Sequence, residues 1–288
     1  MEFRTIVDIP ESPWKIGPCE RMLFIGSCFA DNIGKRFAEE KFRTVVNPYG
    51  VMYNPASILH TVQRLIHDDA MPFSPDEQGT AVMTLGTNHV YILKETGEIV
   101  DNCQKRPQRL FEERELTIAE CADYLAKAIS LICQRFPKTR FILTVSPIRY
   151  RKYGYHESQL SKATLLLAID SLIKGQVSVP DSQGSTATAR HINYFPSFEI
   201  LNDELRDYRF YKPDMLHPSD QAVDYIFERI ASTYFSDATV TFLKEWEPIR
   251  EALNHRPLHP ESEEYQRFKR QTEDQLKALE AKYKLYSR

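Results

Sequence analysis

The sequence lacks any long hydrophobic segment and any excess of basic residues. No apolar run reaches the roughly 18 residues of a membrane-spanning helix, and the first residues mix charged with apolar side chains. The 37 lysines and arginines are balanced by 40 acidic residues, which gives a formal net charge of -3. Nucleic-acid binding calls for a basic surface, so this balance argues against it. We expect a cytoplasmic protein with neither a membrane nor a nucleic acid as partner.

The sequence also lacks the residue spacings that hold metals or disulfides. Its five cysteines are odd in number, widely spread and without a CxxC pair, which argues against a zinc ribbon and a disulfide framework. Its eight histidines show no HExxH spacing. We therefore expect reduced thiols and no metal or other cofactor.

The sequence does contain a regular alternation of two patterns. Short apolar or β-branched runs alternate with stretches whose apolar residues follow helical spacing. This alternation predicts an α/β fold, a three-layer α/β/α sandwich with a mostly parallel central sheet. The expected strands cover 22–26, 43–47, 81–86, 140–146 and 191–195, with a hairpin of 90–93 and 98–100; the expected helices cover 57–65, 117–135, 158–174 and 219–235, besides one that starts at Ser27.

The C-terminal part has a different character. Residues 240–253 and 265–283 predict two charged helices, the second with an apolar stripe. We expect one α/β domain over residues 1–237 and a charged helical extension over residues 238–288, packed on or beside that domain. Self-association into a homo-oligomer through these helices is a further expectation.

Candidate polar residues follow the ends of the predicted strands. Ligands of open α/β sheets gather at the carboxyl ends of the strands, so these side chains are expected to meet at one edge. Ser27 lies at a junction between a strand and a helix. The other positions are Asn47, Gly50, Gly86, Asn88, Ser146 and Arg149, and Tyr150 lies next to the last of these.

Ser27, Asp214 and His217 are the expected catalytic residues. A serine needs a general base within hydrogen-bond reach, itself oriented by a third group. The sequence Asp214-Met215-Leu216-His217 supplies base and orienting carboxylate three residues apart. The backbone N–H of Ser27, at a helix N-terminus, is an expected oxyanion donor.

Further candidates complete the expected site. Gly50 or Gly86 is expected to add a backbone oxyanion donor, and Asn88 a side-chain donor. Asn47, Arg149 and Tyr150 are expected to contact substrate, with Arg149 able to bind a carboxylate or phosphate in a bidentate manner.

The residues alone leave other interpretations open. A serine at a helix start commonly caps the helix, and Asp214 with His217 could be a polar pair before a helix. Cys28 shares the helix N-terminus with Ser27, where a lowered pKa would make it the nucleophile; the alternative is a buried side chain that fills space. Arg149 could instead form a structural ion pair.

The run Gly26-Ser27-Cys28-Phe29-Ala30 resembles the signature of the GSCFA family, a bacterial branch of the SGNH/GDSL hydrolases. The resemblance covers most of the chain in the expected order. It extends through NPYGVMYNP, TLGTNHVY, LTVSPIRY, QLSKATLLLA, DELRDYRFYKPDMLHPS and NHRPLHPESEEY. It implies an SGNH-like catalytic domain with the triad Ser27, Asp214 and His217.

The superfamily's sequence blocks match unevenly. Ile25-Gly26-Ser27 stands where the first block has Gly-Asp-Ser, so the serine is kept and the aspartate is lost. Gly50, or else Gly86, stands for the second-block glycine. The third block, Gly-x-Asn-Asp, resembles residues 86–89 without its final aspartate, and Asp214 to His217 match the fourth block, Asp-x-x-His.

The resemblance implies a serine esterase that removes small, acetyl-like acyl groups from a carbohydrate or related substrate. Two alternatives stay open. An acyltransferase would use the same triad with an acceptor other than water. A non-catalytic binding protein would retain the fold with an inert site, and the two missing aspartates favour it.

Overall fold

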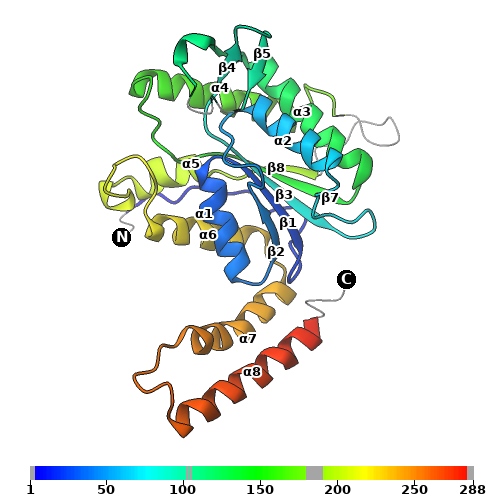
Figure 1. The fold of residues 1–288 in the computed structure, drawn as a ribbon. Coiled ribbons are helices and arrows are strands. Elements are labelled where there is room, and N and C mark those ends of the chain that lie inside the picture. The colour runs from blue at the N-terminus through cyan, green and yellow to red at the C-terminus, as the bar shows by residue number, and fades with distance from the viewer. Residues whose placement is uncertain (1–3, 102, 104–105, 180–190, 284–288) are drawn as a thin grey trace.

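The computed structural model describes residues 4–101, 103, 106–179 and 191–283. Its centre is a sheet of five parallel strands in the order β2-β1-β3-β7-β8 (Figure 1). The strands are β1 (Arg21–Gly26), β2 (Arg43–Val46), β3 (Gly79–Leu85), β7 (Thr139–Val145) and β8 (Ile192–Tyr194). The predicted parallel sheet is confirmed, with strand ends within two residues of those expected.

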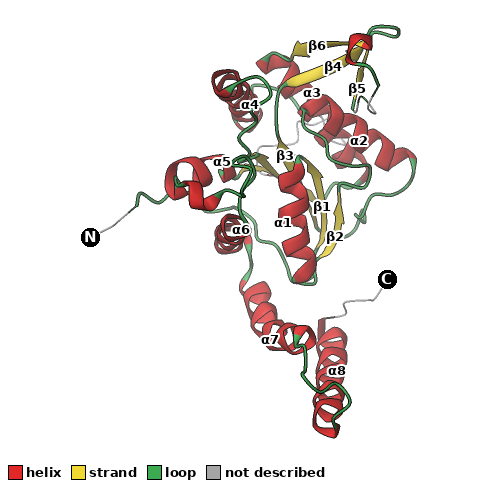
Figure 2. Cartoon of the chain, turned by 60° about the vertical axis from the view of Figure 1, so that its left-hand side comes forward, coloured by secondary structure: helices red, strands yellow, loops and turns green. Residues whose placement is uncertain are grey.

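Helices cover both faces of this sheet, as Figures 1 and 2 show. Successive side chains of a strand point to opposite faces, so Leu23 and Ile25 enter one apolar core while Met22 and Phe24 enter the other. The first core is closed by α2 (Pro55–His67), α3 (Ile118–Arg135) and α4 (Tyr155–Ile173), and the second by α1 (Cys28–Glu39) and α6 (Asp220–Tyr234). The predicted α/β/α sandwich is confirmed.

A small antiparallel sheet lies beside α2 and α3. It contains β4 (His89–Leu93), β5 (Glu98–Val100) and β6 (Phe111–Glu115) in the order β5-β4-β6. The predicted hairpin of β4 and β5 is confirmed, whereas β6 was not predicted because its sequence, FEERE, has a single apolar residue. Short helical segments complete the chain: a 3-10 turn at Gln108–Leu110, α5 (Ser197–Glu199), a π-helix at Ile200–Leu205 and a 3-10 turn at Tyr208–Phe210.

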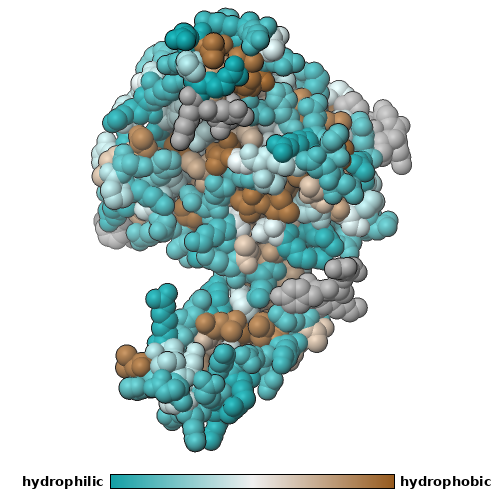
Figure 3. All heavy atoms as spheres, viewed as in Figure 1, coloured by the Kyte–Doolittle hydropathy of each residue, from teal (hydrophilic) through white to brown (hydrophobic). Residues whose placement is uncertain are grey.

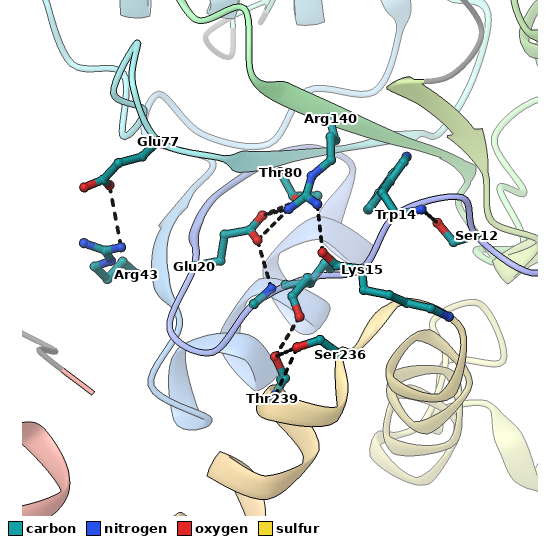
Figure 4. A network of polar contacts seen from close by, with 12 residues as sticks. Ser12, Trp14, Lys15, Glu20, Arg43, Glu77, Thr80, Arg140, Ser236 and Thr239 are labelled. Atoms are coloured by element: carbon teal, nitrogen blue, oxygen red, sulfur yellow. Dashed lines mark hydrogen bonds and ion pairs between the residues drawn. The ribbon is translucent and has the colours of Figure 1, made fainter. Parts of the chain in front are cut away.

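A buried ion pair fixes the amino ends of the central strands (Figure 4). Nη2 of Arg140 on β7 lies 2.6 Å from both carboxylate oxygens of Glu20. The same carboxylate accepts hydrogen bonds from Thr80 Oγ1 on β3 and from the Gly17 backbone N–H. Both charges are almost fully buried, so each depends on the other for compensation. This cluster joins the N-terminal segment to β3 and β7, at the end of the sheet opposite the carboxyl ends.

The C-terminal extension is a helical hairpin of α7 (Asp237–Asn254) and α8 (Glu263–Tyr283) that projects from the α/β part (Figure 2). Trp246 donates its indole N–H to the Glu39 carbonyl at 3.0 Å, and Arg250 pairs with Glu40. Hydrophilic residues dominate the visible face of the hairpin, with hydrophobic spheres near its base and its tip (Figure 3). The hairpin is thus fastened to the end of α1, and its expected role in self-association stays a prediction. No helix in the described part of the chain is long and apolar enough to cross a membrane.

Candidate active site

The turn between β1 and α1 is built by a glycine and a capping serine. Gly26 adopts a φ of +131°, and a Cβ at this position would lie 2.1 Å from the Thr84 carbonyl oxygen. Only glycine therefore allows β1 to pass so close to β3. Ser27 follows as the N-cap of α1, and its Oγ accepts a hydrogen bond from the Phe29 N–H at 3.2 Å. The capping interpretation of Ser27 is confirmed.

The structure buries Ser27 completely. Its residue surface is 0% exposed, and its Oγ also shares a 2.9 Å hydrogen bond with Thr84 Oγ1. Its backbone N–H donates to the Thr84 carbonyl at 3.0 Å and to Thr84 Oγ1 at 2.9 Å. The expected nucleophile and the expected oxyanion donor are therefore both occupied in holding the turn against β3.

Cys28, unlike Ser27, lines a cavity. It is the first residue of α1 and is half-buried, on a cavity of about 390 Å³. His217 lines the same cavity, together with Tyr53, residues 148–152 and Leu216. Burial, and then the charge of Asp31, raise the pKa of the Cys28 thiol to about 11. The lowered pKa considered from the sequence is wrong, so this thiol is protonated at neutral pH.

The carboxylate of Asp214 orients the imidazole ring of His217. Oδ2 of Asp214 lies 2.6 Å from Nδ1 of His217, while Oδ1 accepts the backbone N–H groups of Leu216 and His217. These bonds keep the pKa of Asp214 well below its usual range, so it is ionised and accepts the Nδ1 proton. Nε2 of a neutral His217 then carries the lone pair that can accept a proton. The structure brings this predicted pair together as expected from the Asp-x-x-His spacing.

Arg149 braces the loop that carries this pair. Its backbone N–H donates to the Leu216 carbonyl at 3.0 Å, and its guanidinium donates to the Met215 carbonyl at 3.2 Å. The guanidinium also packs within 5.5 Å of the ring centres of three tyrosines, Tyr155, Tyr208 and Tyr211. Arg149 thus lines the cavity and is tied to the loop by one backbone and one side-chain hydrogen bond. Met215 has a positive φ of 59° in this loop. Tyr150 lines the cavity as well, and its contact with substrate stays a prediction.

The other predicted oxyanion donors are engaged elsewhere. The Gly50 N–H donates to the Asn47 carbonyl, and the Gly86 N–H donates to the Tyr53 carbonyl, each at 2.8 Å. The side-chain amide of Asn88 donates to the Leu116 carbonyl at 2.8 Å and is buried. The structure gives no support to these three predicted donors, because the Gly50 and Gly86 N–H groups and one N–H of the Asn88 amide already have backbone acceptors.

Cys28 offers a backbone donor in their place. As the first residue of a helix, its N–H has no acceptor within α1. The helix dipole also favours negative charge at this end.

Asn47 supports the turn and does not line the cavity. Its side-chain oxygen accepts the Gly26 N–H at 2.9 Å, and its amide donates to Asp31 at 2.6 Å. It therefore fixes the approach to α1, and the structure gives no support to its expected contact with substrate.

The sequence itself contains a signal that favours Cys28. Placing Gly26 on the glycine of the Gly-Asp-Ser block without a gap puts Cys28, not Ser27, on the serine of that block. Tyr53 and residues 151–152 of the cavity wall were missed, because nothing in their local pattern distinguishes them from loop residues. In the part of the chain that the structure describes, no group of three His, Cys, Asp or Glu side chains could hold a metal ion.

The fold and site define an α/β protein with a cysteine, a histidine and an aspartate at the carboxyl edge of a parallel sheet. Comparison with known sequence families identifies the family. The GSCFA family matches residues 21–74 and 74–230, and the C-terminal domain of GSCFA domain proteins matches residues 246–285. The chain belongs to the GSCFA family. No curated protein sequence matches this chain.

Solved structures show a distant likeness. A Streptococcus pneumonia protein provisionally assigned as a platelet activating factor is 16% identical, with 74% of this chain and 84% of that chain covered and a TM-score of 0.44. LAE5, an α/β hydrolase enzyme from the metagenome of Lake Arreo, is 12% identical, covering 76% and 96%, with a TM-score of 0.40. A carbohydrate esterase family 2 enzyme of Corynascus thermopiles with its carbohydrate binding domain is 16% identical, covering 78% and 68%, with a TM-score of 0.38. Likeness at this level says nothing about activity.

Proposed function

We propose that this protein is an acyl-ester hydrolase whose nucleophile is the thiol of Cys28, with His217 as general base and Asp214 as the group that orients it. One observation above all supports this proposal: Cys28 and His217 line the same cavity, whereas the Ser27 hydroxyl is buried against Thr84. The original expectation of a serine nucleophile is replaced, and the expected base and carboxylate are kept.

The first half-reaction forms a thioester. Nε2 of His217 takes the proton of the Cys28 thiol as Sγ attacks the acyl carbonyl carbon. The carbonyl oxygen becomes an oxyanion, which the Cys28 N–H at the start of α1 stabilises. The ester C–O bond then breaks, and the departing alkoxide takes the proton from His217, leaving the acyl group on Sγ and releasing an alcohol.

The second half-reaction returns the free thiol. His217 takes a proton from a water molecule as the water oxygen attacks the thioester carbonyl carbon. The tetrahedral intermediate expels the Cys28 sulfur, which recovers the proton, and a carboxylic acid is released. Because the pKa of Cys28 is raised to about 11, little thiolate exists at neutral pH without a base, and the mechanism depends on His217.

Esters of small acyl groups are the first substrates to assay. Acetyl esters of sugars follow from the family resemblance stated above, and p-nitrophenyl acetate is a convenient chromogenic probe. We expect hydrolysis by the wild type and its loss in Cys28→Ala and His217→Ala.

The matched control is Cys103→Ala. Cys103 is the other half-buried cysteine, and it does not line the cavity with His217. Unchanged hydrolysis in Cys103→Ala, with loss in Cys28→Ala, supports the proposal. Full activity in Cys28→Ala would contradict it.

A further inference from the structure

A buried lysine lies under the candidate site without a carboxylate to compensate it. Lys162, on α4, is 2% exposed. Its Nζ donates to the Gly86 carbonyl at 2.7 Å and to the Ser146 carbonyl at 2.9 Å. These carbonyls belong to the first residues after β3 and β7, so the amine sits between the carboxyl ends of the two central strands. Among the described residues, no carboxylate forms an ion pair with it.

Hydrogen bonding alone does not explain a lysine here. A neutral group with two N–H donors would satisfy the same two carbonyls without the cost of burying a charge. Burial lowers the pKa of Lys162 to about 7, so the amine is charged below neutral pH and loses its charge above it. A buried charge of this kind interacts strongly with its neighbours, because little solvent screens it. A buried lysine without a carboxylate partner, bonded to Ser146 two residues before the cavity-lining segment 148–152, is therefore a candidate for a functional role.

The titratable group that interacts with Lys162 is Cys28. The lysine charge lowers the pKa of this thiol, and a negative sulfur raises the pKa of the lysine. The remaining neighbour of the amine is the ring of Phe198, whose centre lies 5.9 Å from Nζ. Lys162 thus lies behind the cavity wall, because its partner Gly86 donates to the carbonyl of Tyr53, which lines the cavity together with Cys28.

Other charges also face Cys28, and most are compensated. Asp31 on α1 raises the pKa of the thiol. Across the cavity, Lys152 pairs with Glu113 at 2.9 Å, and His217 binds Asp214. Arg149 and Arg151 complete the charged lining on the solvent side, where water screens them. Lys162 is a buried positive charge whose effect on the pKa of Cys28 opposes that of Asp31.

We propose that Lys162 is a positioning residue of this site, whose buried ammonium stabilises negative charge on the Cys28 sulfur while its N–H groups hold the ends of β3 and β7. The proposal rests on the assignment of Cys28 as nucleophile for its catalytic meaning. Its electrostatic content is measurable on the thiol itself, whether or not the protein turns over esters.

The test is the rate of Cys28 alkylation by iodoacetamide, followed by peptide mass spectrometry from about pH 6 to about pH 8. Three variants separate charge from hydrogen bonding. Lys162→Gln removes the charge but keeps two N–H donors, Lys162→Met removes both, and Lys162→Arg keeps the charge. We therefore expect severalfold slower alkylation in the Gln and Met variants at about pH 6, where the wild-type amine is charged, a difference that shrinks toward about pH 8, and a rate close to wild type in the Arg variant.

The outcomes separate the two proposals. Wild-type alkylation rates and pH profile in folded Lys162→Gln, with loss only in Lys162→Met, would mean a structural role and overturn the inference. Slow alkylation in both neutral variants, in a protein whose Cys28 takes up no acyl group, would support the electrostatic role and refute the proposed nucleophile. Cys103, labelled in the same samples, reports whether reagent and folding are unchanged.

Discussion

Replacing Asp214 with asparagine tests how His217 becomes a base. Oδ1 still accepts the Leu216 and His217 backbone N–H groups, so the turn is expected to survive. The new amide, however, faces Nδ1 in place of a carboxylate oxygen that lies 2.6 Å from it. An amide N–H donates to Nδ1 and therefore forces the ring proton onto Nε2. His217 then presents a donor where the thiol of Cys28 requires an acceptor.

The expected loss is large because a whole proton-transfer step depends on this tautomer. A positioned general base contributes about 10²- to 10⁴-fold in rate, so kcat/KM for p-nitrophenyl acetate should fall by about that factor. Asp214→Asn is assayed beside Asp220→Asn, which removes another carboxylate near this loop, one that pairs with Lys212 at 3.2 Å. Activity of Asp214→Asn within about twofold of Asp220→Asn would refute the assigned role of Asp214.

Four further predictions follow from other contacts. Arg140→Met leaves the Glu20 carboxylate buried without its partner. The free energy of unfolding, measured by urea denaturation, should therefore fall by about 3–5 kcal/mol. The rate of Cys28 alkylation in the folded protein should stay unchanged. Arg149→Gln removes the guanidinium that holds the loop through the Met215 carbonyl, so kcat should fall by about tenfold or more. The melting temperature should stay within a few degrees of the wild type. A large fall in melting temperature would instead indicate a purely structural residue. Ser27→Ala removes the cap of α1 and should destabilise the protein by about 1 kcal/mol in thermal unfolding while hydrolysis continues. In His217→Ala, alkylation of Cys28 should rise with pH up to about 11, because a raised pKa keeps the thiol protonated below that value; a plateau near neutral pH would contradict this.

The parallel sheet and its helices could be predicted because each strand is a short apolar run and each helix has its own apolar stripe. Strand β6 could not be predicted, because its mostly charged sequence has no strand pattern and its pairing with β4 is a contact between residues distant in sequence. The C-terminal helices were predicted in place, but their attachment through Trp246 to the end of α1 depends on tertiary contacts.

The site was predictable where chemistry follows local spacing. Asp214 and His217 lie three residues apart, and one turn of chain brings them together. The choice between Ser27 and Cys28 depends on which side chain points at β3, and that follows from the close approach of Gly26 to Thr84. The bonds of the other predicted oxyanion donors could not be predicted either, because the carbonyls that accept from Gly86 and Asn88 are distant in sequence and the one that accepts from Gly50 lies in a turn.

The most direct test locates the acyl group itself. Wild-type protein is mixed with p-nitrophenyl acetate, quenched in acid during turnover, digested and mapped by mass spectrometry, beside Ser27→Ala and Cys28→Ala. The account predicts one acetyl group on Cys28 in the wild type and in Ser27→Ala, removed by neutral hydroxylamine as a thioester. An acetyl group on Ser27, or acetylation that persists at the same level in Cys28→Ala, would contradict it.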